Sequence, residues 1–385
     1  MGQPSSGSAP ETWQHYARQI GEMDLAQLEY APNFLVIAPA KTGTTWLSQN
    51  LSCHPDIYIP PVKEVKFFST YWRWLGINWY LDQFCSASHP IRGEATPSYA
   101  LLPSHRIKFI KSLLPNIKLV FLMRDPVERA WSHAKHSYRY REANFRHPEA
   151  PAAANLDQQF IANFTRPWPC LFGDYLGALQ RWLTCFSKEQ LYIGFFEAIK
   201  DDPQKVLTEV FKHLGAADTV DWSHFRLHEK ILPGIEQEIK PEFKAYLRSL
   251  YQERTQKLAD FLKAEFHITL PSQWTNTVEE KSASDPSVPA DSFWGPDDQF
   301  LVNILREEVF VSGPRLVEKN YRGFNLVIYL GEVYALAQTL GPLDLVQIGA
   351  STLKDYHARG QCFVGATLDE VKQAIAQQVG GVPFG

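Results

Sequence analysis

The stretch "NFLVIAPAKTGTTWLSQNL", residues 33–51, constrains the fold more than any other part of the chain. Its apolar run from Phe34 to Ile37 predicts a buried strand, and the residues from Thr44 onwards predict a helix. A glycine-containing turn from a strand into a helix points several backbone N–H groups at one spot, where the helix dipole adds partial positive charge. The stretch therefore predicts an anion-binding loop within an α/β fold.

The residue order in this loop differs from that of the Walker A motif. In G-x-x-x-x-G-K-[ST] the lysine follows the glycine and the hydroxyl binds Mg²⁺, whereas here Lys41 precedes Gly43. We expect Lys41 to supply a full positive charge at the mouth of the loop, and Thr44 and Thr45 to supply hydroxyl donors. Since no acidic residue stands nearby to hold a metal ion, the loop is expected to neutralise its anion with protein groups alone.

A second strand-to-helix turn lies in "IKLVFLMRDPVERAWSHAKHS", where Ile117–Met123 predict a strand and Pro126 suits a first helical turn. Arg124 stands at the carboxyl end of that strand, the edge at which open α/β sheets bind ligands. Together with the hydroxyl of Ser132, two turns along the helix, it would bind a second phosphate. The alternative is that Asp125 ends a Walker B strand, which would imply Mg²⁺ and a nucleotide-dependent kinase. The position of Arg124 and the lysine order in the first loop favour the phosphate site.

A change of composition divides the chain. The stretch 275–291 is rich in Ser, Asp and Pro and predicts a linker. Before it, after a tail and leading helix over 1–29, strands alternate with helices over 30–274 and predict a P-loop-like central parallel sheet flanked by helices. After it, 292–385 predict a small α+β accessory domain without a catalytic constellation. That domain is a candidate module for binding a protein or a substrate.

The composition narrows the class of ligand. The net charge of −4 over 385 residues argues against a nucleic-acid binder, whose footprint is basic, so any anion must be held by local groups. The five cysteines contain no C-x-x-C pair, which favours a reducing compartment over a zinc site or a disulfide framework. No apolar run reaches the length of about 18 residues that predicts a membrane span.

Four motifs together resemble one enzyme family. "KTGTT" at 41–45 and "RDPxxRxxS" at 124–132 resemble the two signatures of sulfotransferases, which use 3′-phosphoadenosine-5′-phosphosulfate (PAPS) as sulfuryl donor. "HPDIYIPPVKEVKFFS" at 54–69 and "GEATPSY" at 93–99 are similar to segments of the glycosaminoglycan-type and related bacterial members. The resemblance extends over about residues 30–270 and is highly specific as a combination of motifs.

The resemblance implies a role for each loop. The first loop would bind the 5′-phosphosulfate, with Lys41 stabilising charge on the leaving oxygen, and Arg124 and Ser132 would bind the 3′-phosphate. The product would be 3′,5′-ADP, and no metal would be needed. The donor-binding residues expected in the first loop are Lys41, Thr42, Gly43, Thr44, Thr45 and Trp46.

Glu64 is the candidate catalytic base. A hydroxyl is a poor nucleophile until a positioned base takes its proton, and in the resembling enzymes the matching glutamate does so. The alternative is that Glu64 only pairs with Lys63 or Lys66 on a solvated surface. A non-catalytic nucleotide-binding protein is a further alternative, which the presence of both Lys41 and Glu64 disfavours.

The acceptor stays open among carbohydrate, lipid and polyketide-like hydroxyls. Ala95 and Lys66 replace the lysine and histidine that polysaccharide-acting members often carry, which weakens the case for a glycosaminoglycan. The aromatic stretch 70–84 either stacks on the acceptor or caps the site, and His228 and Lys230 either contact the donor or lie on the surface. Because the membrane anchor typical of Golgi sulfotransferases is not found, a cytoplasmic enzyme is expected.

Overall fold

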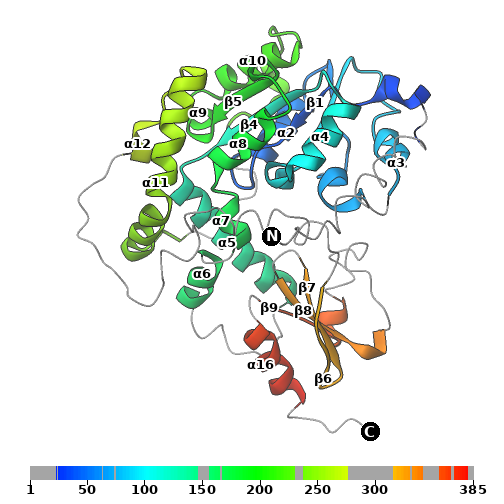
Figure 1. Ribbon diagram of the computed structural model, residues 1–385, viewed down its shortest axis with the longest axis vertical. Coiled ribbons are helices and arrows are strands. Elements are labelled where there is room, and N and C mark those ends of the chain that lie inside the picture. Colours follow the sequence, from blue (N-terminus) through cyan, green and yellow to red (C-terminus); the bar gives the residue numbers. More distant parts are fainter. Residues whose placement is uncertain are drawn as a thin grey trace, which may run out of the picture. The chain divides into compact units, whose positions relative to one another are not determined.

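The chain divides into two compact units, and Figure 1 shows their elements. The computed structural model describes residues 23, 25–62, 64–72, 75–145, 156–164, 167–229, 237–275, 315–329, 332–340, 355–365 and 368–379. The first unit comprises Met1–Arg124, Tyr175–Ile231 and Lys263–Ile268, and the second comprises Asp125–Asp174, Leu232–Leu262 and Thr269–Gly385.

The first unit is built on a five-stranded parallel sheet in the order β2-β3-β1-β4-β5. Its strands are β1 Phe34–Val36, β2 Ile57–Tyr58, β3 Ile91–Ala95, β4 Lys118–Met123 and β5 Leu191–Phe195. β1 and β4 are direct neighbours, with Phe34 opposite Lys118 and Val36 opposite Val120. Because the carboxyl ends of parallel strands meet at one edge of a sheet, the loops that follow β1 and β4 leave the sheet side by side.

Helices pack on both faces of this sheet. They are η1 Leu25–Tyr30, α2 Thr44–Leu51, η2 Phe67–Tyr71, α3 Ile77–Asp82, η3 Pro97–Leu101, α4 Ser104–Leu113, α8 Tyr175–Leu183, η4 Lys188–Gln190, α9 Phe196–Asp201, α10 Pro203–Leu214 and η5 Trp222–His224. Since successive strand residues face opposite sides, Val120 packs in the cluster with α2 and α10, whereas Phe121 faces Tyr175 of α8 with ring centroids 6.2 Å apart. The predicted α/β fold with a central parallel sheet is confirmed.

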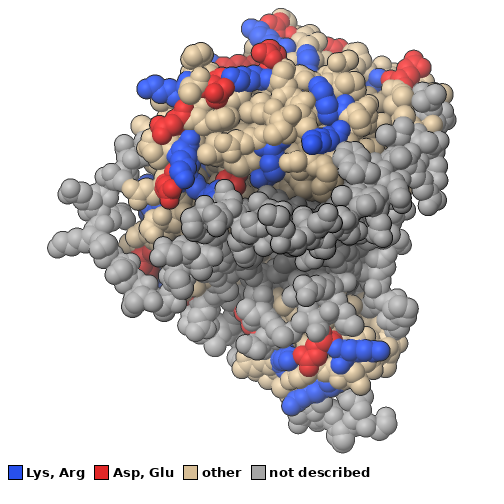
Figure 2. All heavy atoms as spheres, viewed as in Figure 1, with Lys and Arg blue, Asp and Glu red and all other residues tan. Residues whose placement is uncertain are grey.

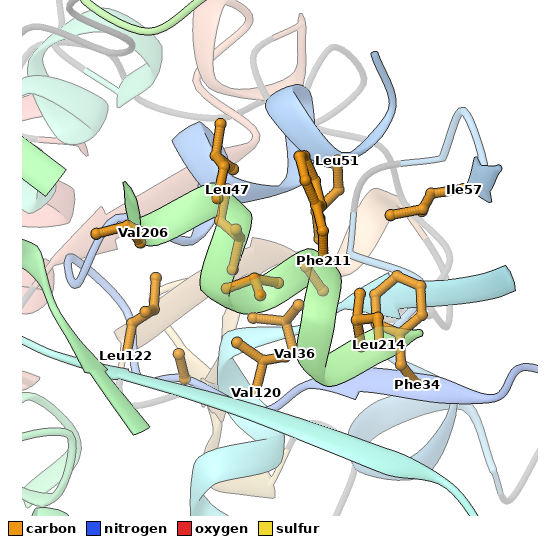
Figure 3. Packing of buried hydrophobic residues seen from close by; sticks show 14 of the residues in the cluster. Phe34, Val36, Leu47, Leu51, Ile57, Val120, Leu122, Val206, Phe211 and Leu214 are labelled. Atoms are coloured by element: carbon orange, nitrogen blue, oxygen red, sulfur yellow. The ribbon is translucent and has the colours of Figure 1, made fainter. Parts of the chain in front are cut away.

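α10 supplies the largest apolar contribution to the α2 side of the sheet. Figure 3 shows Val206, Phe211 and Leu214 of α10 in one apolar cluster with residues of α2 and of the strands. The Asp202 side chain accepts the N–H of Lys205 and caps the helix, which a left-handed Gly215 ends. Each large apolar side chain buried here contributes about 1.5–3 kcal/mol. This cluster fixes α2, and with it the loop that precedes α2, on the sheet.

The second unit contains a helical cluster and a separate sheet. Its helices are α5 Pro126–Phe145, α6 Leu156–Phe164, α7 Pro167–Leu171, α11 Pro241–Phe266 up to Leu262, and α12 Ser272–Thr275. Trp131 of α5 is central to the cluster and meets the edge of Phe160 with ring centroids 4.6 Å apart. At the margin, Arg254 donates to the buried Asp174 carboxylate over 2.7 Å.

The C-terminal sheet is antiparallel, in the order β6-β7-β8-β9. Its elements are β6 Arg315–Tyr321, β7 Phe324–Tyr329, β8 Glu332–Ala337, η7 Gln338–Leu340, β9 Cys362–Gly365 and α16 Leu368–Val379. Val371 and Ile375 of α16 pack on one face of this sheet, as expected for a small α+β part of the fold. The expected linker lies outside the described residues after Thr275, so the domain boundaries stay a prediction.

Candidate active site

The loop between β1 and α2 has an unusual backbone. Gly43 has φ 97°, and a Cβ there would stand 3.0 Å from Ile199 Cδ1 and 3.1 Å from Phe196 Cδ2. Lys41 has φ 74°, a conformation that few residues other than glycine adopt. The Thr42 hydroxyl donates to the Pro39 carbonyl over 2.7 Å and closes the turn. The chain thus folds tightly back on itself directly before α2.

The N-terminus of α2 faces out of this turn. Its first backbone hydrogen bond runs from Leu47 N–H to Gly43 O over 2.9 Å, and Gly43 has no side chain with which to cap the helix. The N–H groups of Thr44, Thr45 and Trp46 therefore stand before Leu47, whose N–H makes the first hydrogen bond within the helix, and this arrangement favours an anion. The Trp46 side chain is buried and donates its indole N–H to Leu227 O over 3.1 Å, so only its backbone faces this spot.

Arg124 lies against this loop. Its Nη1 stands 3.5 Å from the Lys41 carbonyl oxygen, and its guanidinium lies 4.5 Å from the centre of the Phe196 ring. The Tyr175 hydroxyl donates to the Arg124 carbonyl over 2.7 Å and so fixes the end of β4. The Arg124 guanidinium is therefore brought to the backbone of the loop that carries Lys41, 83 positions earlier in the sequence. On the face in Figure 2, basic side chains lie among acidic ones.

The other members of the second motif lie in the second unit. The Asp125 carboxylate is buried and accepts the N–H groups of Val127 and Glu128 over 2.8 and 3.2 Å, so it caps α5. Burial raises the pKa of this carboxyl, although both N–H groups lower it. Ser132 is half-buried on α5. Within the described residues no group of three or more His, Cys, Asp or Glu could hold a metal ion.

Glu64 stands in a strained segment. Glu64 has φ 60° and Lys66 has φ 55°, and the π-helical turn η2 follows at once. Left-handed non-glycine residues cost of order 1–3 kcal/mol each and gather at functional sites, as π-turns do. The Glu64 carboxylate lies 3.2 Å from the Lys66 ammonium, and 29% of its side chain is exposed. Glu64 therefore does pair with Lys66, and solvent or a ligand can still reach its carboxylate.

Two hydroxyl groups hold the backbone of this segment. Lys66 N–H donates to Thr96 Oγ1 and Phe68 N–H donates to Tyr99 Oη, each over 3.2 Å. Both hydroxyls donate in turn to the buried Glu94 carboxyl, over 2.6 Å from Thr96 and 2.7 Å from Tyr99. Burial raises the pKa of Glu94 to about 7, although these donors lower it. Sequence reasoning singled out the motif "GEATPSY" but missed Glu94, because a glutamate between Gly93 and Ala95 is ordinary in sequence.

Arg106 holds the same segment from its carbonyl side. This buried guanidinium donates through Nη1 to Phe68 O over 2.8 Å and to Ser69 O over 2.9 Å, and it lies 4.3 Å from the centre of the Trp72 ring. Sequence reasoning missed Arg106 too. Its signal was a position four residues before Ile110, which puts it on the apolar face of α4.

The aromatic residues after Glu64 are mainly packing. Phe67 and Tyr80 stack with ring centroids 4.9 Å apart, and both are buried. Tyr71 and Trp79 are half-buried and meet edge to face at 6.1 Å. The cluster therefore holds η2 against α3, and only its outer two rings could reach a ligand.

The segment after α10 is tied to α2. Arg226 N–H donates to Asn50 Oδ1 over 2.8 Å, which adds to the bond between Leu227 and Trp46. His228 follows and is exposed, whereas Lys230 lies outside the described residues. The predicted late donor loop therefore starts beside the first loop, and the role of its side chains stays a prediction.

Relatives of known name match the chain in part. The bifunctional heparan sulfate N-deacetylase/N-sulfotransferase 4 of Mus musculus is 33% identical over 214 residues, which is 51% of this chain and 23% of the relative. The membrane-associated sulfotransferase kil1 of Dictyostelium discoideum is 26% identical over 316 residues, which is 61% of this chain and 66% of the relative. The chain thus spans less than a quarter of the length of the heparan sulfate relative.

Solved structures match at lower similarity. A sulfotransferase from Alicyclobacillus acidocaldarius has a TM-score of 0.48 and 24% identity, and covers 64% of this chain and 99% of its own. Mouse sulfotransferase SULT7A1 complexed with PAP has a TM-score of 0.42 and 15% identity, and covers 66% of this chain and 94% of its own.

The expected cytoplasmic localisation is contradicted by these relatives. One of them is named as membrane-associated, and others are heparan sulfate enzymes. Among the helices described, none has the length and apolarity that crossing a membrane requires. That expectation rests on cysteine spacing and on apolar runs, which are properties of the folded chain and do not specify a cellular compartment.

The family follows from a match over more than half of the chain. The model of the sulfotransferase domain matches residues 31–231, which contain the first loop, Glu64, Arg124 and the whole five-stranded sheet. The chain belongs to the sulfotransferase family.

Proposed function

We propose that this protein transfers a sulfuryl group from PAPS to an acceptor hydroxyl and releases 3′,5′-ADP. The observation that carries the proposal is the contact of the Arg124 guanidinium with the Lys41 carbonyl at the N-terminus of α2. It brings the Arg124 guanidinium to the loop that carries Lys41 and leads into the N-terminus of α2, and a donor with two separate anionic groups requires positive groups close together.

The first loop is the proposed site of the 5′-phosphosulfate. The N–H groups at the start of α2 and the hydroxyls of Thr44 and Thr45 would donate to its oxygens, and Lys41 would face the bridging oxygen. Gly43 keeps this loop tight, because a Cβ there would stand 3.0 Å from Ile199 Cδ1 and 3.1 Å from Phe196 Cδ2. Arg124 and Ser132 are the proposed partners of the 3′-phosphate.

The proposed reaction is an in-line displacement. The acceptor oxygen forms a bond to sulfur while the bond from sulfur to the phosphate oxygen breaks, and the electron pair leaves on that oxygen. Lys41 stabilises this developing charge, a role whose loss typically lowers the rate about 10²–10³-fold. The Glu64 carboxylate takes the proton of the acceptor hydroxyl.

Support for Glu64 as the base comes from its segment. Its carboxylate is partly exposed, stands on a backbone held at two N–H groups and two carbonyls, and has Lys66 3.2 Å away. A group that merely paired with a surface lysine would not need so rigid a backbone. Lys66 would have to move aside, or stay as a second cation, when the acceptor binds.

The acceptor class is the open part of the proposal. The names of the heparan sulfate relatives record N-sulfation, so amines belong beside hydroxyls in any screen. Transfer of labelled sulfate from PAPS would be measured with sugars, lipids and carrier-bound acyl chains, each in a hydroxyl and an amine form. We expect acceptors of one class to become labelled, and we expect this labelling to be lost in the Lys41→Ala variant. If no acceptor were labelled while 3′,5′-ADP bound without metal, the protein would bind the nucleotide without catalysis.

No specific observation favours the kinase alternative. The Asp125 carboxylate that would have to hold Mg²⁺ already accepts two N–H groups of α5. The discriminating measurement is nucleotide binding in the presence of a chelator. Binding of 3′,5′-ADP that survives chelation supports the proposal, whereas binding of ATP that depends on Mg²⁺ would overturn it.

A further inference from the structure

The hydrogen bonds around Glu94 have a defined direction. The Thr96 hydroxyl accepts Lys66 N–H through a lone pair, so its single hydrogen must point elsewhere, and it points at Glu94 Oε2. The Tyr99 hydroxyl likewise accepts Phe68 N–H and points its hydrogen at Glu94 Oε1. Each carboxyl oxygen therefore accepts from one hydroxyl, which in turn accepts from a backbone N–H of the segment around Glu64 (64–71), called the Glu64 segment below. Each such chain of two hydrogen bonds is called a relay.

Only the carboxylate completes both relays. An ionised carboxyl accepts on both oxygens, but a protonated one carries a hydrogen on one of them. The hydroxyl that faces that oxygen then meets a donor and a weaker, uncharged acceptor, so its hydrogen bond to Glu94 weakens and it can turn its lone pair away from the amide. The segment loses one of its two N–H anchors, although the two carbonyl anchors to Arg106 remain.

We propose that Glu94 is a positioning residue, which as a carboxylate holds the Glu64 segment in place through Thr96 and Tyr99 and on protonation releases one of the two anchors. The part that concerns Glu64 rests on the proposed function. Glu94 touches neither donor nor acceptor in this scheme and acts only through the backbone of Lys66 and Phe68.

The surroundings of Glu94 support proton dependence near neutral pH. Burial raises its pKa to about 7, whereas Thr96, Tyr99, Tyr80 and the Val65 N–H favour the ionised form. The titratable groups that face it are the phenols of Tyr99 and Tyr80, and burial and the Glu94 charge keep their pKa values well above the ordinary value. Both phenols therefore stay neutral donors while Glu94 changes its charge.

Glu94→Gln tests the proposal directly. Glutamine keeps the size but offers one acceptor oxygen and one NH₂ donor, so it reproduces the protonated carboxyl. Amide hydrogen exchange of the peptide over 64–71 would be measured at pH 8 in the free protein. We expect one of the two amides, that of Lys66 or that of Phe68, to exchange about tenfold faster or more, as loss of a buried hydrogen bond implies. Exchange at the wild-type rate would overturn the proposal.

Two further variants separate positioning from folding. Thr96→Val removes one hydroxyl at nearly constant volume and leaves Glu94 in place, whereas Thr96→Ser keeps the hydroxyl. Faster exchange in the valine variant with wild-type exchange in the serine variant is the expected pattern. It remains decisive even if Glu94→Gln fails to fold. Equal exchange in both variants would show that the Thr96 hydroxyl does not protect these amides.

The proton dependence has its own measurement. After correction for intrinsic exchange, protection of these two amides in the wild-type protein should fall as the pH is lowered from about 8 to about 6. It should be independent of pH in Glu94→Gln. Constant protection in the wild-type protein would refute the release of an anchor.

Catalysis and positioning can fail separately. In the active enzyme Glu94→Gln should lower kcat about tenfold or more at pH 8, with 3′,5′-ADP affinity unchanged, because the donor loop is not anchored to Glu94. The exchange measurement needs no donor or acceptor. If no sulfuryl transfer existed, the exchange result would still decide the positioning role. If transfer existed and exchange did not change, only the positioning role would fail.

Discussion

Gly43→Ala tests whether the loop before α2 tolerates any side chain. At φ 97° an alanine costs about 1–2 kcal/mol in backbone strain. Its Cβ would also meet Ile199 Cδ1 at 3.0 Å and Phe196 Cδ2 at 3.1 Å, and such overpacking costs about 1–3 kcal/mol. Both atoms are side-chain ends that can shift by a few tenths of an ångström, so we expect the free energy of unfolding to fall by about 2–3 kcal/mol in total.

The same substitution should weaken donor binding, because Phe196 carries the Arg124 guanidinium 4.5 Å above its ring. Urea unfolding measures the stability change, and titration with 3′,5′-ADP measures the affinity. Gly76→Ala is the matched control, since Gly76 has φ −68° and no atom within 4 Å of the added Cβ, and it should change stability by less than about 0.5 kcal/mol. If the two variants had equal stability and equal affinity, the description of the loop as closed to side chains would be wrong.

Four further outcomes are expected. Lys41→Ala should lower kcat about 10²–10³-fold in a PAPS-dependent assay while the unfolding midpoint stays near wild type, because this ammonium serves the leaving oxygen. Arg124→Ala should weaken 3′,5′-ADP binding far more than 5′-AMP binding in calorimetric titration, and equal losses would contradict a 3′-phosphate contact. The pKa of Glu94 is raised from 4.5 to about 7 on folding. Its contribution to the free energy of unfolding should therefore fall by about 3 kcal/mol as the pH rises through this range. Glu94→Gln should abolish this pH dependence in urea titrations. Truncation at about residue 280 should leave 3′,5′-ADP affinity unchanged, because the proposed donor residues Lys41, Arg124 and Ser132 all precede the cut; a collapse of affinity in a folded fragment would assign the C-terminal part to the site.

The elements that the sequence predicted well are those whose signal is local. The run from Phe34 to Ile37 and the run from Ile117 to Met123 are apolar and end in turn residues, so two buried strands could be predicted without any partner. The turns between these strands and their helices follow from Gly43 and Pro126. β1 and β4 are neighbours because of the order of the strands in the sheet. The apolar pattern of a single strand does not predict that order.

The parts of the candidate site that were missed depend on distant contacts. Glu64 and Lys66 are left-handed without being glycine, a conformation that no local pattern announces. It exists because Thr96 and Tyr99 hold the amides of Lys66 and Phe68 across about 30 positions of sequence. A glutamate at the end of a strand is ordinary in sequence, so the burial of Glu94 and the relays that end on it become visible only in the folded chain.

The anchoring of the Glu64 segment by charged groups has a physical reason. Phe67 and Phe68 are fully buried among aromatic rings, and that burial holds the segment down, but hydrophobic contact has no direction and leaves the backbone free to choose its turn. Hydrogen bonds do have direction. Glu94 fixes the N–H groups of Lys66 and Phe68 through its hydroxyl relays, and Arg106 fixes the carbonyls of Phe68 and Ser69. Burying a carboxylate and a guanidinium costs several kcal/mol per charge before compensation, a cost that packing alone does not require. A segment that had only to cover the core could omit both groups, whereas one that must present a carboxylate at a set place could not.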